Sequence, residues 1–239
     1  PNYNVDDADE TSFATDWLAI KTIEFIDEHQ DEPFCYMVSF PDPHGPNTVR
    51  APYDTMYADV EVEIPSTITR TPDQIPAWGQ GQGANPEQIR KLMPPYYGMV
   101  RCIDDNVAMM IEALREKDLL DNTVIVFTAD HGDLCGEHQR LNKGVPYEGS
   151  AKIPFILYQP GKVEGGLVID EALSCVDFFP TITSLLEIEH DVAVEGRDAS
   201  PLFFGEMPDD WNDIAFIRAT SGGTWLAAVT DDYKLVFSK

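Results

Sequence analysis

The sequence has little positive charge. Its 239 residues contain 16 Lys and Arg against 42 Asp and Glu, which gives a formal net charge of −26 at pH 7. Nucleic-acid binding by counterion replacement requires basic patches, and anionic membranes attract basic segments. The charge balance therefore argues against nucleic acids and membrane surfaces as partners. An anionic substrate would need locally concentrated positive charge, which draws attention to His44, His138, Arg140 and Lys143.

Cysteines and long apolar runs are scarce as well. The four cysteines form no C-x-x-C pair, which argues against a zinc ribbon. No apolar run is long enough to span a bilayer. The chain begins with Pro1 rather than Met, and we expect it to be a piece of a longer protein.

Helical and strand-like patterns alternate along the chain, and 43% of the residues are hydrophobic, enough for a sizeable core. Periodicity predicts helices over 15–29 and 96–118, the second opened by Pro94-Pro95, and residues 176–180 are expected to lead into a helix through Leu186. Apolar runs predict buried strands over 34–40, 124–127 and 153–158, and shorter runs predict strands over 171–174, 214–219, 224–229 and 233–237. This order predicts one α/β domain over 1–239, with a small antiparallel extension from about residue 214.

Two of the predicted strands end in polar residues that suit chemistry on an anion. Asp130-His131-Gly132 follows the strand at 124–127, and His44 follows the strand at 34–40. Ligands in α/β sheets bind beyond the carboxyl ends of strands. Asp130 supplies hard oxygen ligands and Lys143 a point positive charge. The long loop over 45–85 adds Arg50, Arg70 and Trp78 as weaker candidates for substrate contact.

Both segments resemble type I sulfatases of the alkaline phosphatase superfamily. The first carries D-H-G-x-x-x-G-E-H from Asp130 to His138, then Lys143, then Tyr147-Glu148-Gly149 and a Pro-led apolar strand. The second reads P-F-x-x-x-V-S-F-x-x-P-H-x-P from Pro33 to Pro46. This similarity implies hydrolysis of sulfate esters. It also implies a mixed, mostly parallel sheet flanked by helices, of the alkaline phosphatase type and incomplete on its N-terminal side.

The resemblance assigns roles to five residues. Asp130 and His131 would bind a divalent metal, with Ca²⁺ expected and Mg²⁺ or Mn²⁺ left open because nitrogen is an atypical calcium ligand. Lys143 would hold a sulfate oxygen, and His44 would contact the sulfate and assist the departing alcohol, so these two are the catalytic candidates. His138 would line the substrate pocket with His44 and Lys143.

One part of the family pattern is absent from the sequence. Type I sulfatases convert a Cys or Ser in C/S-x-P-x-R to formylglycine, the nucleophile, and no such pattern occurs in this chain. We therefore expect the nucleophile, and the formylglycine, to lie in a missing N-terminal segment, and we expect this piece alone to be inactive.

Two alternative functions remain open. The parent could be a phosphonate monoester hydrolase or phosphodiesterase of the same superfamily, or the chain could be a non-catalytic anion-binding domain. From the family we expect a sulfated saccharide or another anionic small molecule as substrate, and export as the location. We also expect self-association through an exposed sheet edge.

Overall fold

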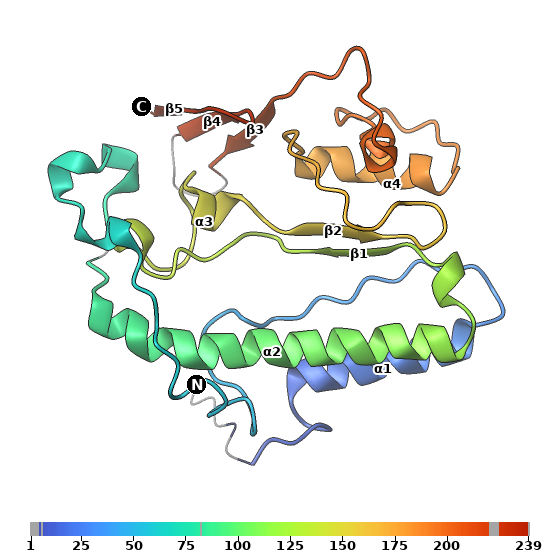
Figure 1. Cartoon of the computed structure of the whole chain (residues 1–239), viewed down its shortest axis with the longest axis horizontal. Coiled ribbons are helices and arrows are strands. Elements are labelled where there is room, and N and C mark those ends of the chain that lie inside the picture. The colour runs from blue at the N-terminus through green and yellow to red at the C-terminus, as the bar shows by residue number, and fades with distance from the viewer. Residues whose placement is uncertain (1–4, 6, 82, 220–224, 239) are drawn as a thin grey trace. The chain divides into compact units, whose positions relative to one another are not determined.

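The computed structural model describes residues 5, 7–81, 83–219 and 225–238 (Figure 1). Its residues form two compact units. The first comprises Pro1–Ile75, Gln80–Thr123 and Leu134–Leu141, and the second Pro76–Gly79, Val124–Asp133 and Asn142–Lys239. Neither unit is a continuous stretch of sequence. The single domain expected over 1–239 stays a prediction.

The first unit is built on two helices. α1 (Ala14–His29) packs along α2 (Pro86–Glu116), as Figure 1 shows. The core beside them holds Phe13, Val49, Tyr53, Met99 and Cys102. Short 3₁₀ turns complete the described regular structure of this unit: η1 (Ser66–Thr69), η2 (Pro72–Gln74), η4 (Leu120–Asn122) and η5 (Glu137–Gln139).

The expected start of the second helix was wrong. α2 begins at Pro86, and Pro94 and Pro95 lie inside it. Asn85 caps the start: its side chain accepts from the Gln88 amide at 3.1 Å, and the Gln88 side chain accepts from the Asn85 amide at 3.1 Å. This reciprocal capping satisfies two otherwise unpaired amides. It supplies a stronger start signal than the proline pair.

The second unit contains two antiparallel sheets. β1 (Ile125–Thr128) pairs with β2 (Phe155–Tyr158), with Ile125 opposite Tyr158. β3 (Ala215–Arg218), β4 (Trp225–Val229) and β5 (Lys234–Ser238) form the other sheet in that order. The helices are α3 (Glu148–Ala151) and α4 (Phe178–Leu185), with 3₁₀ turns η3 (Ala77–Gly79), η6 (Cys175–Asp177) and η7 (Ser200–Phe204). β3, β4 and β5 pair antiparallel, and the expectation that they form an extension of the domain stays a prediction.

The structure corrects three expectations about strands. Every strand pair in the described residues is antiparallel, so the expected parallel majority is not found there. Residues 34–40 are extended but form no strand, and 171–174 are not a strand either. A run of β-forming residues becomes a strand only when a partner binds its amides and carbonyls, and the described part of the chain supplies none for 34–40.

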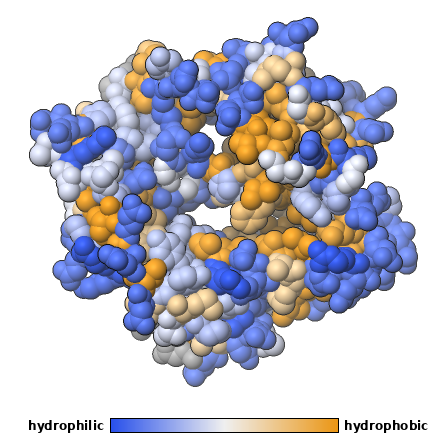
Figure 2. All heavy atoms as spheres, viewed as in Figure 1, coloured by the Kyte–Doolittle hydropathy of each residue, from blue (hydrophilic) through white to orange (hydrophobic). Residues whose placement is uncertain are grey.

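The strands are also more exposed than expected. Phe127 in β1 is 40% exposed and Ile156 in β2 is 59% exposed. Apolar side chains gather on the surface over β2 and α4, as Figure 2 shows. Strands that are buried on both faces have continuous apolar sequences. The sequences of β1 and β2 are of this kind, although the described residues leave these side chains partly exposed. Among the described residues no helix combines the length and hydrophobicity that a bilayer crossing requires.

Candidate active site

The end of β1 leads into a loop held by its neighbours. The Thr128 hydroxyl donates to the Pro154 carbonyl at 2.9 Å, and the Gly132 amide donates to the Ser150 carbonyl at 2.9 Å. A Cβ added at Gly132 would stand 2.3 Å from the Gly149 carbonyl oxygen. Only glycine permits this approach. Gly132 therefore fixes where the loop that carries Asp130 and His131 can run.

Asp130 and His131 form an open acid–base pair. The His131 amide donates to Asp130 Oδ1 at 2.9 Å, and His131 Nε2 lies 3.5 Å from Asp130 Oδ2. The other ring nitrogen, Nδ1, lies 2.9 Å from the Gly132 carbonyl. A carbonyl only accepts, so Nδ1 carries the proton, and in the neutral ring the lone pair of Nε2 faces the carboxylate. This matches the arrangement of metal-binding histidines, whose second nitrogen donates to a backbone carbonyl.

Lys143 lies between two anchored residues of the neighbouring loop. The Asn142 amide donates to Asp133 Oδ1 at 3.0 Å, and the Gly144 amide donates to Ser150 Oγ at 3.2 Å. Gly144 has φ of +97°, a conformation that favours glycine. The contacts at Gly132, Asn142 and Gly144 tie this loop to the one that carries Asp130.

The C-terminal sheet braces the same loop. Lys234 of β5 donates to the Pro146 carbonyl at 2.8 Å and also pairs with Glu148. Sequence reasoning missed this contact, because nothing in the sequence links positions 88 residues apart. The extension thus supports the site.

His138 lies in the first unit and is 9% exposed. Its backbone is left-handed, with φ of 52°, and its amide donates to the Thr67 hydroxyl at 3.0 Å. Arg70 Nη1 lies 3.4 Å from His138 Nδ1. Burial and the Arg70 charge lower the pKa of His138. The neutral ring is therefore favoured, with Nδ1 accepting from the guanidinium.

His44 lies in an exposed turn of the first unit. Its amide donates to the Pro41 carbonyl at 3.1 Å, and its Nδ1 lies 2.9 Å from the Gly45 carbonyl. As at His131, this contact assigns the proton to Nδ1. Burial raises the pKa of the nearby Asp42, although the Thr15 hydroxyl donates to it at 2.5 Å.

The structure thus brings together some of the predicted residues. Asp130, His131 and Lys143 lie on loops of the second unit that hydrogen bonds connect, and His44 and His138 lie in the first. A common basin for all five stays a prediction. The described residues contain no group of three or more His, Cys, Asp or Glu side chains arranged to hold a metal. Asp130 and His131 would therefore supply only part of a coordination shell.

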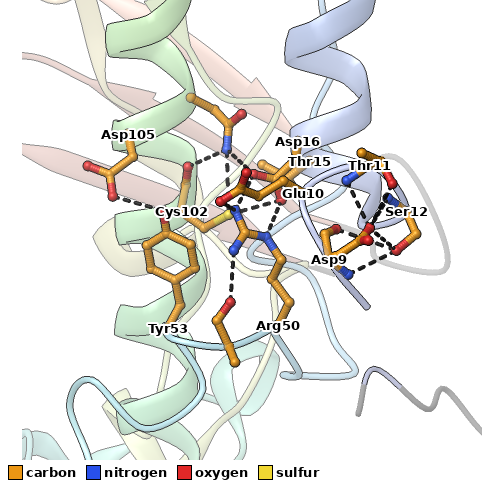
Figure 3. Close-up of polar contacts among 12 residues, drawn as sticks. Asp9, Glu10, Thr11, Ser12, Thr15, Asp16, Arg50, Tyr53, Cys102 and Asp105 are labelled. Atoms are coloured by element: carbon orange, nitrogen blue, oxygen red, sulfur yellow. Dashed lines mark hydrogen bonds and ion pairs between the residues drawn. The ribbon is translucent and has the colours of Figure 1, made fainter. Parts of the chain in front are cut away.

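Arg50, a weaker substrate candidate, has a structural role instead (Figure 3). Its Nε and Nη2 donate to the two carboxylate oxygens of Asp16 at 2.8 and 2.7 Å, and Nη1 donates to the Ala51 carbonyl at 2.8 Å. Asn106 Nδ2 also donates to Asp16, at 3.1 Å. Both charged side chains are buried, at 7% and 3% exposure. Trp78 instead packs on Tyr147, with ring centroids 5.0 Å apart.

The pKa shifts of the groups around Arg50 agree with a structural role for this residue. Burial alone would raise the pKa of Asp16, but hydrogen bonds from Arg50 and Asn106 and the Arg50 charge outweigh it and lower the pKa. Burial raises the pKa of Cys102 to about 12, and burial with the Asp105 hydrogen bond raises that of Tyr53 to about 12. Cys102 is therefore a protonated core residue and no nucleophile.

Comparison with known proteins decides the family. Residues 1–188 match the family model described as Sulfatase. The chain belongs to the sulfatase family. The sulfatase chain is 31% identical to an arylsulfatase of Clostridium perfringens over 216 residues, which are 86% of this chain and 44% of that protein. It therefore spans about half the length of this relative.

Solved structures place the sulfatase chain in the alkaline-phosphatase-like fold. It superposes on a phosphonate monoester hydrolase from Silicibacter pomeroyi with a TM-score of 0.75 and 22% identity, covering 96% of this chain and 54% of that one. It superposes on a protein solved in complex with its substrate D-glucosamine-2-N,6-O-disulfate with a TM-score of 0.78 and 19% identity, covering 95% and 62%. The expected α/β class and the alkaline-phosphatase-like fold are confirmed.

Proposed function

We propose that this chain supplies the metal- and anion-binding part of a sulfuric ester hydrolase. The observation that carries the proposal is the Asp130–His131 pair. Its carboxylate is 86% exposed, and the ring nitrogen that faces it, 3.5 Å away, has its tautomer fixed by the Gly132 carbonyl. Two lone-pair donors facing one another in the open suit a cation between them.

The residues fit a divalent cation. Carboxylate oxygen suits Ca²⁺, Mg²⁺ and Mn²⁺ alike, whereas the imidazole nitrogen shifts the preference away from calcium. When bound, such a cation neutralises charge on the sulfate and polarises it for attack. Further ligands would come from protein outside this chain, from water or from the substrate. Calcium remains the family-based expectation, with Mg²⁺ and Mn²⁺ as the alternatives.

Lys143 and His44 complete the proposed chemistry. The Lys143 ammonium would hold a sulfate oxygen and lower the electrostatic barrier to attack on an anionic centre. His44 would contact the sulfate and give a proton to the departing alcohol oxygen from its imidazolium form. His138 is buried and its pKa is lowered by burial and the Arg70 charge, so it would line the pocket rather than act as an acid. In this scheme the S–O bond to the alcohol would break as an attacking oxygen from outside this chain bonds to sulfur, and the alcohol would leave with the donated proton.

The attacking group would come from outside this chain. The sequence contains no C/S-x-P-x-R, so formylglycine would form in another part of the complete protein. We accordingly propose that the 239 residues bind the anion but do not turn over. We propose sulfated saccharides as substrates, because a structural neighbour was solved with a glucosamine disulfate as its substrate.

The test compares the protein encoded by the complete gene with this chain on an aryl sulfate. We expect hydrolysis by the complete protein only. Lys143→Gln in the complete protein should lower kcat by about 10²–10³-fold, the usual loss when one charge-stabilising donor is removed. Lys162→Gln, which removes the same charge from the turn after β2, serves as the control and should leave kcat unchanged. Full hydrolysis by the Lys143 variant would refute the assignment.

A phosphonate substrate is the second candidate, favoured by the likeness to the phosphonate monoester hydrolase. The complete protein should therefore be assayed on an aryl sulfate and an aryl phosphonate side by side. A kcat/KM larger on the phosphonate would replace the sulfatase proposal. Export, and self-association through a sheet edge, stay predictions.

A further inference from the structure

Some cations of the first unit have a carboxylate partner. In a chain with 42 acidic residues, Arg50 pairs with Asp16 and Lys117 with Asp27. Within the described ranges, neither Arg70 nor Arg140 forms an ion pair. Charge left uncompensated in so acidic a protein marks a place where an external anion can bind.

Both arginines lie around His138. Arg70 Nη1 is 3.4 Å from His138 Nδ1. The Gln139 side chain donates to the Arg70 carbonyl, and Arg140 Nη1 donates to the Gln80 carbonyl. The Ala84 amide donates to the Gln139 carbonyl at 3.1 Å. Segments on either side of η2 are therefore fastened to residues 138–140, with the backbone of Arg70 and the guanidinium group of Arg140 held by hydrogen bonds.

The immediate surroundings select for an anion. Arg140 Nε is shielded from solvent and has no acceptor among the described residues. A buried donor without an acceptor is costly and calls for a partner. Burial and the Arg70 charge lower the pKa of His138, a neighbour that could otherwise compete as a cation, and so favour its neutral form. Arg70 itself is exposed, so its fork of N–H donors is open to a ligand.

We propose that Arg70 and Arg140 form an anion subsite that recognises a second sulfate or carboxylate on a polyanionic saccharide. The proposal rests on the proposed function and narrows it from any sulfate ester to saccharides that carry at least two acidic groups. Guanidinium groups bind planar or tetrahedral oxyanions through parallel N–H donors, which gives selectivity for a second anionic group that neutral sugars lack. The loop over 45–85 acquires a function through this subsite.

The experiment measures binding to the 239-residue chain by calorimetry. The probes are D-glucosamine-2-N,6-O-disulfate and D-glucosamine-6-O-sulfate. We expect the disulfate to bind at least about tenfold more tightly, the factor for one charge-assisted hydrogen bond. Arg70→Gln should remove most of that preference, and Arg140→Gln should weaken it. Arg70→Lys, which keeps the charge but loses the fork, should fall between wild type and Arg70→Gln.

A matched control and a local probe separate binding from misfolding. Arg115→Gln removes one positive charge near the far end of α2, about 39 Å from Ile89 at 1.5 Å per residue, and should keep the full preference. Ile89 is the reference because it lies beside Gly136, next to the subsite. In NMR spectra, the chemical shifts of the His138 imidazole should change when inorganic sulfate is titrated into the wild type. They should remain unchanged in Arg70→Gln.

Several outcomes would overturn the subsite. One is a wild-type chain that binds the two sugars equally or binds neither. Another is a preference that survives both arginine variants or falls as far in Arg115→Gln. None of these touches the hydrolysis of a mono-anionic aryl sulfate by the complete protein, which tests the proposed function through Lys143. Failure of the subsite can therefore be distinguished from failure of the proposed function.

Discussion

Two acid–base pairs of the molecule, the closed pair of Asp16 with Arg50 and the open pair of Asp130 with His131, differ in burial and in spacing. Asp16 and Arg50 are 3% and 7% exposed and share two hydrogen bonds of 2.8 and 2.7 Å. Asp130 and His131 are 86% and 33% exposed, with side-chain atoms 3.5 Å apart. In the first pair the polar atoms satisfy one another. In the second they keep most of their capacity to bind, which is what a site for a cation requires.

The difference explains why only one pair carries fold stability. An exposed ion pair contributes between about 0 and 1 kcal/mol, whereas loss of one partner of a buried pair leaves a desolvated charge. Asp16 is charged in the interior because Arg50 and Asn106 both donate to it. The network in Figure 3 is therefore a structural anchor that joins α1, α2 and the loop containing Arg50.

The largest effect expected follows from breaking the closed pair. Arg50→Met should lower the free energy of unfolding by about 3–5 kcal/mol, because Asp16 stays buried without its cation. Urea denaturation followed by circular dichroism measures it. Arg115→Met breaks an exposed pair with Glu112 and should cost no more than about 0.5 kcal/mol. Equal losses in both variants would show that burial does not distinguish the pairs.

Acid should then erase the difference between wild type and Arg50→Met. The pKa of Asp16 is lowered in the folded wild type, so its stabilising contribution is complete above the unfolded pKa of about 3.9 and is lost as pH falls through the folded pKa. In Arg50→Met, burial without a cation should raise that pKa instead, so protonation relieves the variant. The stability gap should be widest at neutral pH and narrow below about pH 4. A gap that stays constant over this range would contradict the role of the Asp16 charge.

Much of the fold could be predicted because local patterns carry it. The stripe of Met99, Cys102 and Ile103 predicted α2, and short apolar runs predicted β1 and β2. The predicted start of α2 was wrong because the prediction placed the two adjacent prolines at the opening of the helix. The capping pair Asn85 and Gln88 marks the true start. The strand at 34–40 was wrong for another reason. Strand formation depends on a partner, and no property of the segment itself reveals whether that partner is present.

The residues of the candidate site could likewise be predicted from local patterns, whereas the contacts that hold them in place could not. Asp130, His131 and Lys143 could be found from a contiguous pattern of residue types. The Asp16–Arg50 pair could not, because its partners are 34 positions apart and neither carries a local signature. The anchoring of the Lys143 loop by Lys234 was missed for the same reason. Motifs encode chemistry locally, whereas the contacts that hold a site in place are encoded by tertiary packing.

The smallest effect expected lies at the open pair. Asp130→Asn keeps an oxygen that can accept from the His131 amide, the contact of 2.9 Å seen in the structure. Without metal, its unfolding free energy should therefore stay within about 0.5 kcal/mol of wild type. A cation that binds only the folded state at a concentration equal to its Kd adds about 0.4 kcal/mol. Wild type should gain such stabilisation with millimolar Mn²⁺ or Ca²⁺, and the variant should gain none.

Asp231→Asn makes this prediction specific. It removes the same charge from an exposed turn of the second unit and should keep the metal-dependent gain in full. Loss of the gain in both variants would mean that cations act on the net charge of −26 rather than at a site, since general screening does not depend on which carboxylate is removed. Comparison of Mn²⁺ with Ca²⁺ then identifies the preferred ion, because the imidazole of His131 favours the former. A gain confined to wild type and Asp231→Asn, and larger with Mn²⁺, would assign the open pair to metal binding and the closed pair to stability alone.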